Sequence, residues 1–182
     1  MSTITYSCIL SITTYRVFVK TLESRKMALC GKVSTAYEGE ATAAKFYNVF
    51  RKQLQFIPNI SSEVQGARLL EGEWDKVGAV IHWEYTIDEE EQSAKGKIET
   101  IDDENKVITF SLFDGDVSEN YKSFKGTLQV MDGEYGGLVR WTFEYEKLKE
   151  DITGAVMDFY LDLVAEITKD VDAHLVEEEQ QI

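Results

Sequence analysis

The sequence predicts an α+β fold in which an antiparallel sheet packs against one long C-terminal helix. Three observations support this prediction. Most segments between residues 29 and 148 alternate apolar and polar residues, which is typical of strands with one buried face. Short hairpin loops join the later strands, so their pairing is expected to be antiparallel. Residues 153–177 instead repeat apolar residues at steps of three and four, the period of an amphipathic helix.

The pattern begins with one strand followed by two short helices. Leu29–Glu38 alternates loosely and predicts the first strand. Ala41–Gln53 has an apolar face with helical spacing, and Gln55–Ile60 follows it. Pro58 suits a break or the first turn of a helix better than a helix interior. We therefore predict two consecutive short helices, or a helix and a turn.

Six further strands are predicted after these helices. Their expected bounds are Val64–Glu71, Lys76–Asp88, Ser93–Asp102, Val107–Asp114, Tyr121–Met131 and Leu138–Leu148. The connections include an acidic hairpin loop at Asp88–Gln92, a loop at Gly115–Glu119 and a glycine-rich hairpin at residues 132–137. One strand, two short helices, six strands and a long helix, in that order, give the α+β class.

The C-terminal helix is expected to run from about Thr153 to about Glu177, a length of roughly 37 Å at the usual rise per residue. Its apolar face is formed by Val156, Phe159, Tyr160, Leu163, Ile167 and Val171. The opposite side is mostly charged, with Asp158, Asp162, Glu166, Lys169, Asp170 and Asp172. We predict that the sheet curves around this helix and that the space between them is the functional feature.

Alternation along the strands assigns many side chains to the face of the sheet that meets the helix. The strands contribute Ala79, Ile81, Trp83, Tyr85, Ile98, Ile108, Phe110, Leu112, Phe124, Leu128, Val139, Trp141, Phe143 and Tyr145. The helix adds Val156, Phe159, Tyr160 and Leu163, whereas Ile167, Val171 and Leu175 are expected to seal the packed end. This set suits a hydrophobic ligand, because it is apolar with a few phenols. It fits a dry, filled core equally well, because periodicity marks a buried face and not its contents.

Composition and charge exclude several classes of protein. The formal net charge of -14 argues against binding to nucleic acid or anionic membranes, which would repel the chain. No apolar run approaches the 18 or so residues that span a bilayer. Two cysteines, Cys8 and Cys30, are too few for a disulfide framework, so a reducing cytoplasmic compartment is the simplest expectation. We expect a monomer or a weak dimer.

The polar residues predict neither catalysis nor a metal or cofactor site. His82 falls on the outward face of its strand and His174 near the end of the long helix, and neither has a Cys or Ser partner at a recognisable spacing. The acidic clusters match no calcium-loop spacing. Tyr85, Tyr145 and Tyr160 are the inward residues with a proton to donate. We favour a hydrogen bond to a ligand hydroxyl over acid catalysis for these phenols.

The first 26 residues differ from the remainder of the chain. They hold four basic residues and one acid, a net charge of +3. Residues 27–182 therefore carry a net charge of −17, and the two parts sum to −14. Three interpretations stay open: an organelle transit peptide, a secretory signal, which fits less well, or residues upstream of an ordinary start at Met27. We favour the third, with residues 27–182 as the domain and residues 1–26 poorly ordered or loosely packed.

Ten stretches in this order resemble the plant major latex protein family, within the superfamily of birch-pollen allergens and class-10 pathogenesis-related proteins. They are KFYNVFRKQ (45–53), IPNI (57–60), VQG (64–66), EGEWDKVGAV (71–80), WEYTID (83–88), AKGKIETIDDENK (94–106), DGD (114–116), YKSFKGTLQV (121–130), EYEKLKED (144–151) and TKDVDAHL (168–175). The resemblance covers the chain from Met27 onward, and the opening Met27-Ala28-Leu29-Cys30-Gly31-Lys32 also resembles the usual start of the family.

The resemblance implies the helix-grip fold, a seven-stranded antiparallel sheet wrapped around the C-terminal helix with a V of two short helices at one end. It also implies a large internal cavity that takes hydrophobic molecules such as sterols, fatty acids or flavonoids, and a role in plant defence and stress responses. The inward residues, apart from Ala79, then become the expected cavity lining. Two alternatives stay open: an isomerase or condensing enzyme, which needs an inward Lys, Asp or Glu, and a ligand-dependent regulator of a protein partner.

The sequence departs from the superfamily in one loop. Pathogenesis-related relatives carry a glycine-dense loop between strands two and three, whereas residues 71–78 here retain only Gly72 and Gly78 among acids and Trp74. An acidic loop is a poor anion site, so we expect these two glycines to serve as turn residues. Trp74 is expected either to cover an opening or to pack on the sheet edge.

Overall fold

The computed structural model describes residues 29–180, so the expectations for residues 1–26 and for a start at Met27 lie outside the described residues. The strands are β1 (Cys30–Glu38), β2 (Val64–Glu71), β3 (Val80–Ile87), β4 (Glu90–Asp102), β5 (Val107–Gly115), β6 (Tyr121–Asp132) and β7 (Gly137–Lys147). The helices are α1 (Ala43–Lys52), the 3-10 turn η1 (Leu54–Phe56), α2 (Ile57–Ile60), α3 (Val117–Asn120) and α4 (Gly154–Gln180).

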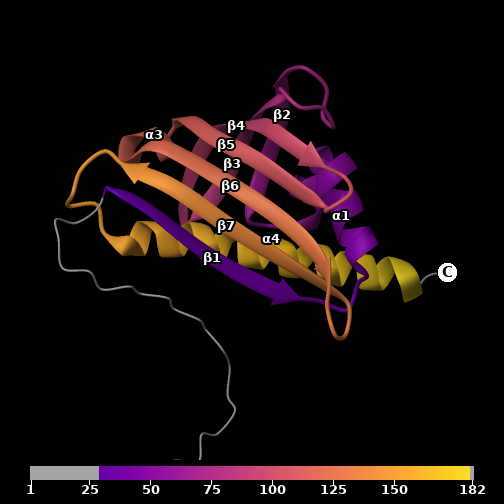
Figure 1. The fold of residues 1–182 in the computed structure, drawn as a ribbon. Coiled ribbons are helices and arrows are strands. Elements are labelled where there is room, and N and C mark those ends of the chain that lie inside the picture. The colour runs from indigo at the N-terminus through magenta and orange to yellow at the C-terminus, as the bar shows by residue number, and fades with distance from the viewer. Residues whose placement is uncertain (1–28, 181–182) are drawn as a thin grey trace, which may run out of the picture.

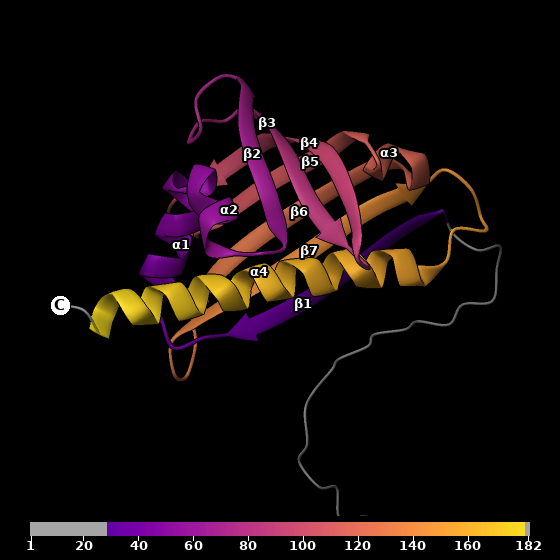
Figure 2. The ribbon, with the colours of Figure 1, turned by 180° about the vertical axis from the view of Figure 1, so that it is seen from behind.

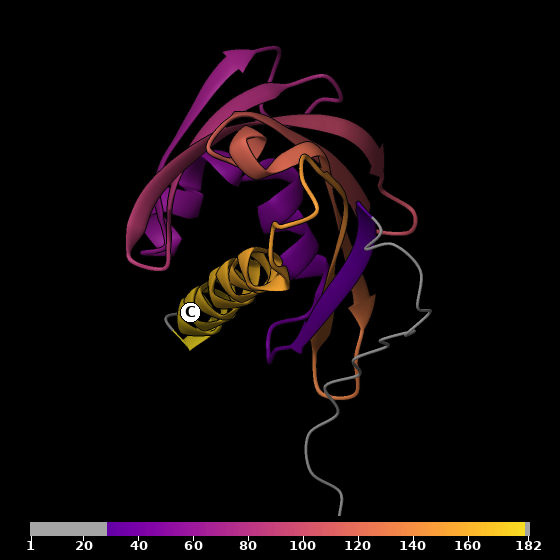
Figure 3. The same cartoon turned by 90° about the vertical axis from the view of Figure 1, so that its left-hand side faces the viewer.

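The seven strands form one antiparallel sheet in the order β1-β7-β6-β5-β4-β3-β2 (Figure 1). Every strand after β2 pairs with its neighbour in sequence, as the short connections require, and β1 closes the other edge against β7. The view from behind shows α4 running across the concave side of this sheet (Figure 2). Seen end-on, the sheet curves around α4, with α1 and α2 behind (Figure 3). The predicted α+β class and helix-grip architecture are confirmed.

Several predicted bounds were wrong, each for a local reason. β3 begins at Val80 and not at Lys76, because residues 76–79 form a turn in which Gly78 has a φ of +90°. β4 begins at Glu90, so the hairpin turn is only Asp88 and Glu89, both with positive φ, as a tight two-residue turn demands. The predicted loop before β6 contains α3.

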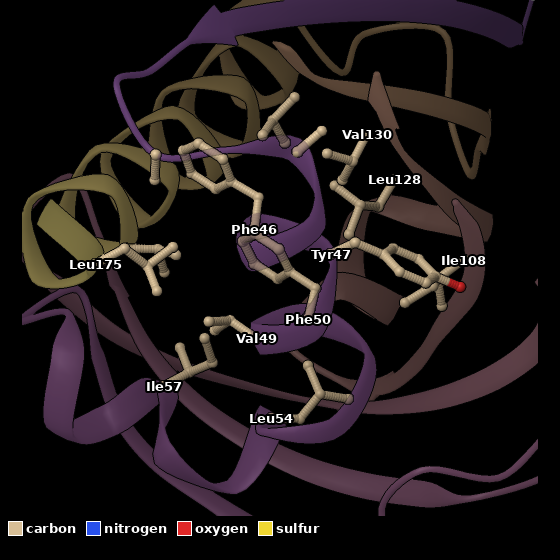
Figure 4. Close-up of a cluster of buried hydrophobic side chains, with 14 of the residues drawn as sticks. Phe46, Tyr47, Val49, Phe50, Leu54, Ile57, Ile108, Leu128, Val130 and Leu175 are labelled. Atoms are coloured by element: carbon tan, nitrogen blue, oxygen red, sulfur yellow. The ribbon is translucent and has the colours of Figure 1, made fainter. Parts of the chain in front are cut away.

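The short helices cover one end of the sheet and build the packed core there. In α1, Phe46, Val49 and Phe50 recur at helical spacing and are buried, and Pro58 lies in the first turn of α2. These side chains meet Leu175 of α4 and residues of β5 and β6 (Figure 4). Val171 is also fully buried in this cluster. Its position fits the expectation that the far part of α4 seals the packed end.

A buried carboxylate fixes α4 at this packed end. The sequence placed Asp172 on the charged side of the helix, but it is only 6% exposed. Its two oxygens accept hydrogen bonds from the Tyr37 hydroxyl at 3.0 Å and from the backbone N–H groups of Glu40 and Ala41 at 3.1 and 2.9 Å. A Cβ on Gly39 would lie 2.5 Å from this carboxyl group, so a larger residue there would displace Asp172 from its hydrogen bonds. The charge is buried because it is paired with donors.

A second anchor ties α1 to two loops. The guanidinium of Arg51 donates to the Asp103 carboxylate at 2.8 Å and to the Asp75 carbonyl at 2.7 Å. The Tyr47 hydroxyl donates to the same Asp103 oxygen at 2.8 Å. Trp74 packs against the core cluster beside these loops, which favours its expected packing role over a covering one. The β2–β3 loop is thereby held by side-chain contacts in place of a glycine-rich backbone.

Candidate functional site

An apolar cavity lies between α4 and the concave face of the sheet. Its volume is about 140 Å³ in this conformation. The short helices supply Phe50, Leu54 and Ile57, the sheet supplies Val64, Trp83, Tyr85, Gly96, Phe110, Leu112, Gly126, Trp141 and Phe143, and α4 supplies Tyr160, Leu163, Val164 and Ile167. None of these 16 lining residues carries a charge, so the site can hold an apolar molecule but offers it no ionic partner.

Aromatic rings form a large part of the cavity wall. Trp141 lies at the centre, stacked on Phe110 with ring centroids 6.4 Å apart and edge-on to Phe50 at 5.6 Å. Its indole N–H donates to the Thr168 hydroxyl of α4 at 3.1 Å, and that hydroxyl donates to the Val164 carbonyl at 2.6 Å. The polar edge of the indole is therefore satisfied within the protein, and its ring is held in place as an apolar wall.

Two glycines on the inner face of the sheet make room for the cavity. Gly126 of β6 pairs with Phe110 of β5 and Phe143 of β7, and Gly96 of β4 pairs with Leu112. A Cβ on Gly126 would approach the Phe143 ring to 3.1 Å. Glycine within a strand often marks a close approach of another group to the backbone. Here the missing side chains let the rings of Trp83 and Phe143 lie close against the sheet backbone, where they form part of the cavity wall.

Four phenols gather at one end of the cavity, and we call them the tyrosine cluster: Tyr85, Tyr121, Tyr145 and Tyr160. The Tyr160 ring packs edge-on against Tyr85 at 6.4 Å and Tyr121 at 6.3 Å, and Tyr121 packs against Tyr145 at 5.5 Å. Burial raises the pKa of all four phenols, and the carboxylates of Asp116 or Asp158 raise each pKa further. The cluster is therefore neutral around pH 7.

Eight of the 17 expected lining residues border the cavity, and the other nine lie elsewhere. Those on the cavity are Trp83, Tyr85, Phe110, Leu112, Trp141, Phe143, Tyr160 and Leu163. Those packed in the core around it are Ile81, Ile98, Ile108, Phe124, Leu128, Val139, Tyr145 and Val156. Phe159 is 37% exposed and lies off the cavity, so its inward assignment was wrong. The buried stripe of α4 instead passes through Met157, Tyr160, Val164, Thr168 and Val171.

The residues that sequence reasoning missed come from three sources. Phe50, Leu54, Ile57 and Val64 lie on the short helices and the start of β2, from which no lining residue was predicted. Gly96 and Gly126 have no side chain and so do not contribute to a hydrophobic pattern. An isolated glycine within a strand could still have indicated a close approach to the backbone. Val164 and Ile167 lie on α4, where Ile167 was expected to seal the packed end and instead borders the cavity.

The cavity is smaller than the resemblance implies. Sites for drug-sized ligands usually measure about 300–1,000 Å³, whereas an apolar cavity of about 150 Å³ is known to hold a benzene-sized molecule. The walls here interlock through aromatic contacts between the sheet, α1 and α4. A sterol-sized ligand would therefore require outward movement of these walls, while a slender or small planar molecule needs much less.

Known proteins share both the sequence pattern and the fold of this chain. Residues 28–178 match the family model described as Pathogenesis-related protein Bet v 1 family. MLP-like protein 31 of Arabidopsis thaliana is 38% identical over 155 residues, which cover 84% of this chain and 90% of that protein. Major latex protein 149 of Papaver somniferum is 31% identical over 149 residues, which cover 81% of this chain and 92% of that protein. The crystal structure of ginseng major latex-like protein 151 from Panax ginseng superposes with a TM-score of 0.76 at 34% identity. The superposition covers 81% of this chain and 98% of that protein.

These relatives are matched over most of their own length, and the model match spans all seven strands and most of α4. Among the helices of residues 29–180, none combines the length and the apolar character needed to cross a membrane. The fold, the order of elements and the sequence matches agree with one another. The chain belongs to the major latex protein group within the Bet v 1 family of pathogenesis-related proteins.

Proposed function

We propose that this chain binds hydrophobic small molecules in the cavity between α4 and the sheet, and that it carries or buffers them. The observation that supports this most directly is a cavity bordered by 16 uncharged side chains and walled by aromatic rings. Transfer of apolar ligand surface into it would contribute about 25 cal/mol per Å² before the costs of association. The Bet v 1 fold supports the same proposal.

The cavity volume limits the size of ligand that fits without movement of the walls. A cavity of about 140 Å³ favours slender acyl chains and small planar aromatics over sterols, unless α4 or the short helices move. Sterols, fatty acids and flavonoids all stay within the proposed range of ligands, ordered by how far each one would have to displace the walls. The proposed setting is the cytoplasm of a plant cell during defence or stress, which follows from the family and not from the geometry.

The enzyme hypothesis has less support from the site. It required an inward Lys, Asp or Glu, and none borders the cavity among the described residues. Asp172 is the buried acid, but it lies in the packed end and its oxygens are occupied by Tyr37 and two backbone N–H groups. These three hydrogen bonds give Asp172 a structural role at a distance from the cavity lining. We therefore propose binding without catalysis.

The test is a titration with the neutral fluorescent probe 1-aminoanthracene, compared between two variants of the same helix. Leu163→Trp places a large ring in the cavity, whereas Phe159→Trp changes an exposed aromatic residue that lies off the cavity. We expect Leu163→Trp to weaken binding at least about tenfold, since bound probe and indole would compete for the same space. Phe159→Trp should bind as the parent does. Equal loss in both variants, or no binding by the parent chain at micromolar probe, would refute the proposal.

A further inference from the structure

Two phenol hydroxyls in the tyrosine cluster are buried without a hydrogen-bond partner. Tyr85 is 6% exposed and Tyr121 is 3% exposed, and neither hydroxyl makes a hydrogen bond of acceptable geometry among residues 29–180, although the Tyr85 and Tyr160 hydroxyls lie close enough to affect each other's pKa. Two tyrosines elsewhere differ, since the partly buried Tyr37 donates to Asp172 and the buried Tyr47 donates to Asp103. A buried hydroxyl without a partner destabilises a folded protein. Such a hydroxyl beside a binding cavity therefore indicates that its hydrogen bond is made to a ligand.

The position of these hydroxyls connects them to the cavity. Tyr85 and Tyr160 both border the cavity, on β3 and α4 respectively. Tyr121, at the start of β6, lies directly behind the Tyr160 ring, with centroids 6.3 Å apart. A ligand that reaches this end of the cavity therefore meets the rings of Tyr85 and Tyr160, whose hydroxyls are buried beside the cavity and must turn towards it to bind a ligand oxygen. The remaining wall is apolar, which leaves the tyrosine cluster as the place where a polar ligand atom can be satisfied.

We propose that the tyrosine cluster is the polar end of the ligand site, and that it selects neutral molecules whose terminal oxygen is a hydroxyl or a carbonyl. This inference rests on the proposed function. A phenol can donate to either kind of oxygen and can accept from a hydroxyl, so the unpartnered Tyr85 hydroxyl gains its missing hydrogen bond when the ligand binds. The apolar body of the ligand then lies between Trp83, Trp141 and Leu163.

The charges around the cluster disfavour a carboxylate in the same position. The ionised groups that act on these phenols are Asp116, before α3, and Asp158, on α4, and both are acidic. Lys147 is the basic residue opposite Tyr121 in the β6–β7 ladder, but its ammonium donates to the Ile152 carbonyl at 2.8 Å. A buried carboxylate would therefore lose its hydration without gaining a cation, which costs far more than burying an alcohol.

The test compares two ligands with the same ten-carbon chain, 1-decanol and decanoate, by isothermal titration calorimetry at neutral pH. We expect 1-decanol to bind at least about tenfold more tightly, since only decanoate must bury an unpaired charge. Equal affinities, or tighter binding of decanoate, would overturn the inference and leave the proposed function standing. Binding of neither ligand would count against both. This comparison needs no variant, so it does not depend on whether a substituted chain folds.

The role of the hydroxyl is tested by Tyr85→Phe, with Tyr135→Phe as the matched control at an 80% exposed position. Tyr85→Phe should weaken 1-decanol binding by about three- to tenfold, the usual value of one hydrogen bond, and should leave decanoate binding unchanged. It should also keep or raise the melting temperature of the free protein, because it removes an unpartnered buried hydroxyl. A lower melting temperature with unchanged decanol affinity would show a purely structural tyrosine and overturn the assignment.

Discussion

At the scale of single residues, Asp172 is the most consequential side chain outside the cavity. It joins α4 to the β1–α1 connection through three hydrogen bonds, one of them from Tyr37. Asp172→Asn keeps the shape but removes the charge and one acceptor, so we expect a loss of about 2–4 kcal/mol in the free energy of unfolding. Urea denaturation measures it, with Asp162→Asn on the exposed side of the same helix as control. A loss below about 0.5 kcal/mol, the size of an ordinary surface change, would contradict this role.

Gly126 gives a second prediction at this scale. Gly126→Val fills part of the cavity from the sheet side, and the new Cβ contacts the Phe143 ring. We expect the affinity for 1-aminoanthracene to fall at least about fivefold, and the free energy of unfolding to fall by about 1–3 kcal/mol, because the buried Phe143 ring must shift to admit the larger side chain. Thr127→Val adds the same side chain on the outer face of the same strand and should leave affinity unchanged. Unaltered probe binding by Gly126→Val would show that this space is not the binding site.

Alternation predicted the burial of individual residues well in strands and less well in the helix. Ile81, Tyr85 and Phe143 point inward as their period of two requires. In α4 the choice between adjacent positions depends on the angle at which the helix crosses the sheet, which no periodicity contains. The buried side is therefore rotated from Phe159 towards Met157, and Asp172 turns inward because local donors stabilise its charge.

At the scale of elements, the contact between α1 and its neighbouring loops predicts an acid-sensitive anchor. The Arg51 guanidinium, and then the Tyr47 hydroxyl, hold the pKa of Asp103 below its ordinary value. A lowered folded pKa stabilises the protein at neutral pH, and this contribution is lost as pH falls through the folded pKa. Arg51→Met should therefore lower the urea midpoint at neutral pH and change it much less below the pKa of Asp103. An equal effect at both pH values would show that Arg51 acts through packing alone.

Element types followed from the sequence, whereas several element ends did not. Strand alternation and helical spacing were sufficient to place seven strands and α4, because each signal is summed over many residues. The same spacing, together with Pro58, placed the two predicted short helices. The hairpin loop predicted at Asp88–Gln92 was too long, because neither Asp88 nor Glu89 is glycine, although both adopt positive φ and form a two-residue turn. The cavity itself is a product of packing between distant elements, so composition alone could not distinguish it from a filled core.

At the scale of the whole molecule, buried phenols predict a loss of stability in alkali. Burial and then Asp172 raise the pKa of Tyr37 to about 12, and burial raises the pKa of Tyr85, Tyr121 and Tyr160 as well. The unfolded chain loses these protons near pH 10, so stability is complete below about pH 10 and falls as pH rises towards the folded pKa values.

Urea midpoints between neutral pH and about pH 11 measure this decline. The double variant Tyr85→Phe with Tyr121→Phe should show a shallower decline than the parent chain, because two of the raised pKa values are gone. Tyr135→Phe provides the control for removing an exposed phenol. Identical slopes in all three proteins would show that the buried tyrosines do not control the alkaline limb.

The central claim is that the interior between α4 and the sheet receives hydrophobic molecules. The most direct measurement is an NMR experiment that detects nuclear Overhauser effects between bound 1-decanol and the side chains of the protein. We expect contacts from the chain of the ligand to Trp83, Trp141 and Leu163, and from the hydroxyl end to the ring of Tyr85. Contacts confined to residues on the outer face of the sheet, such as Thr127 and Thr142, would contradict it.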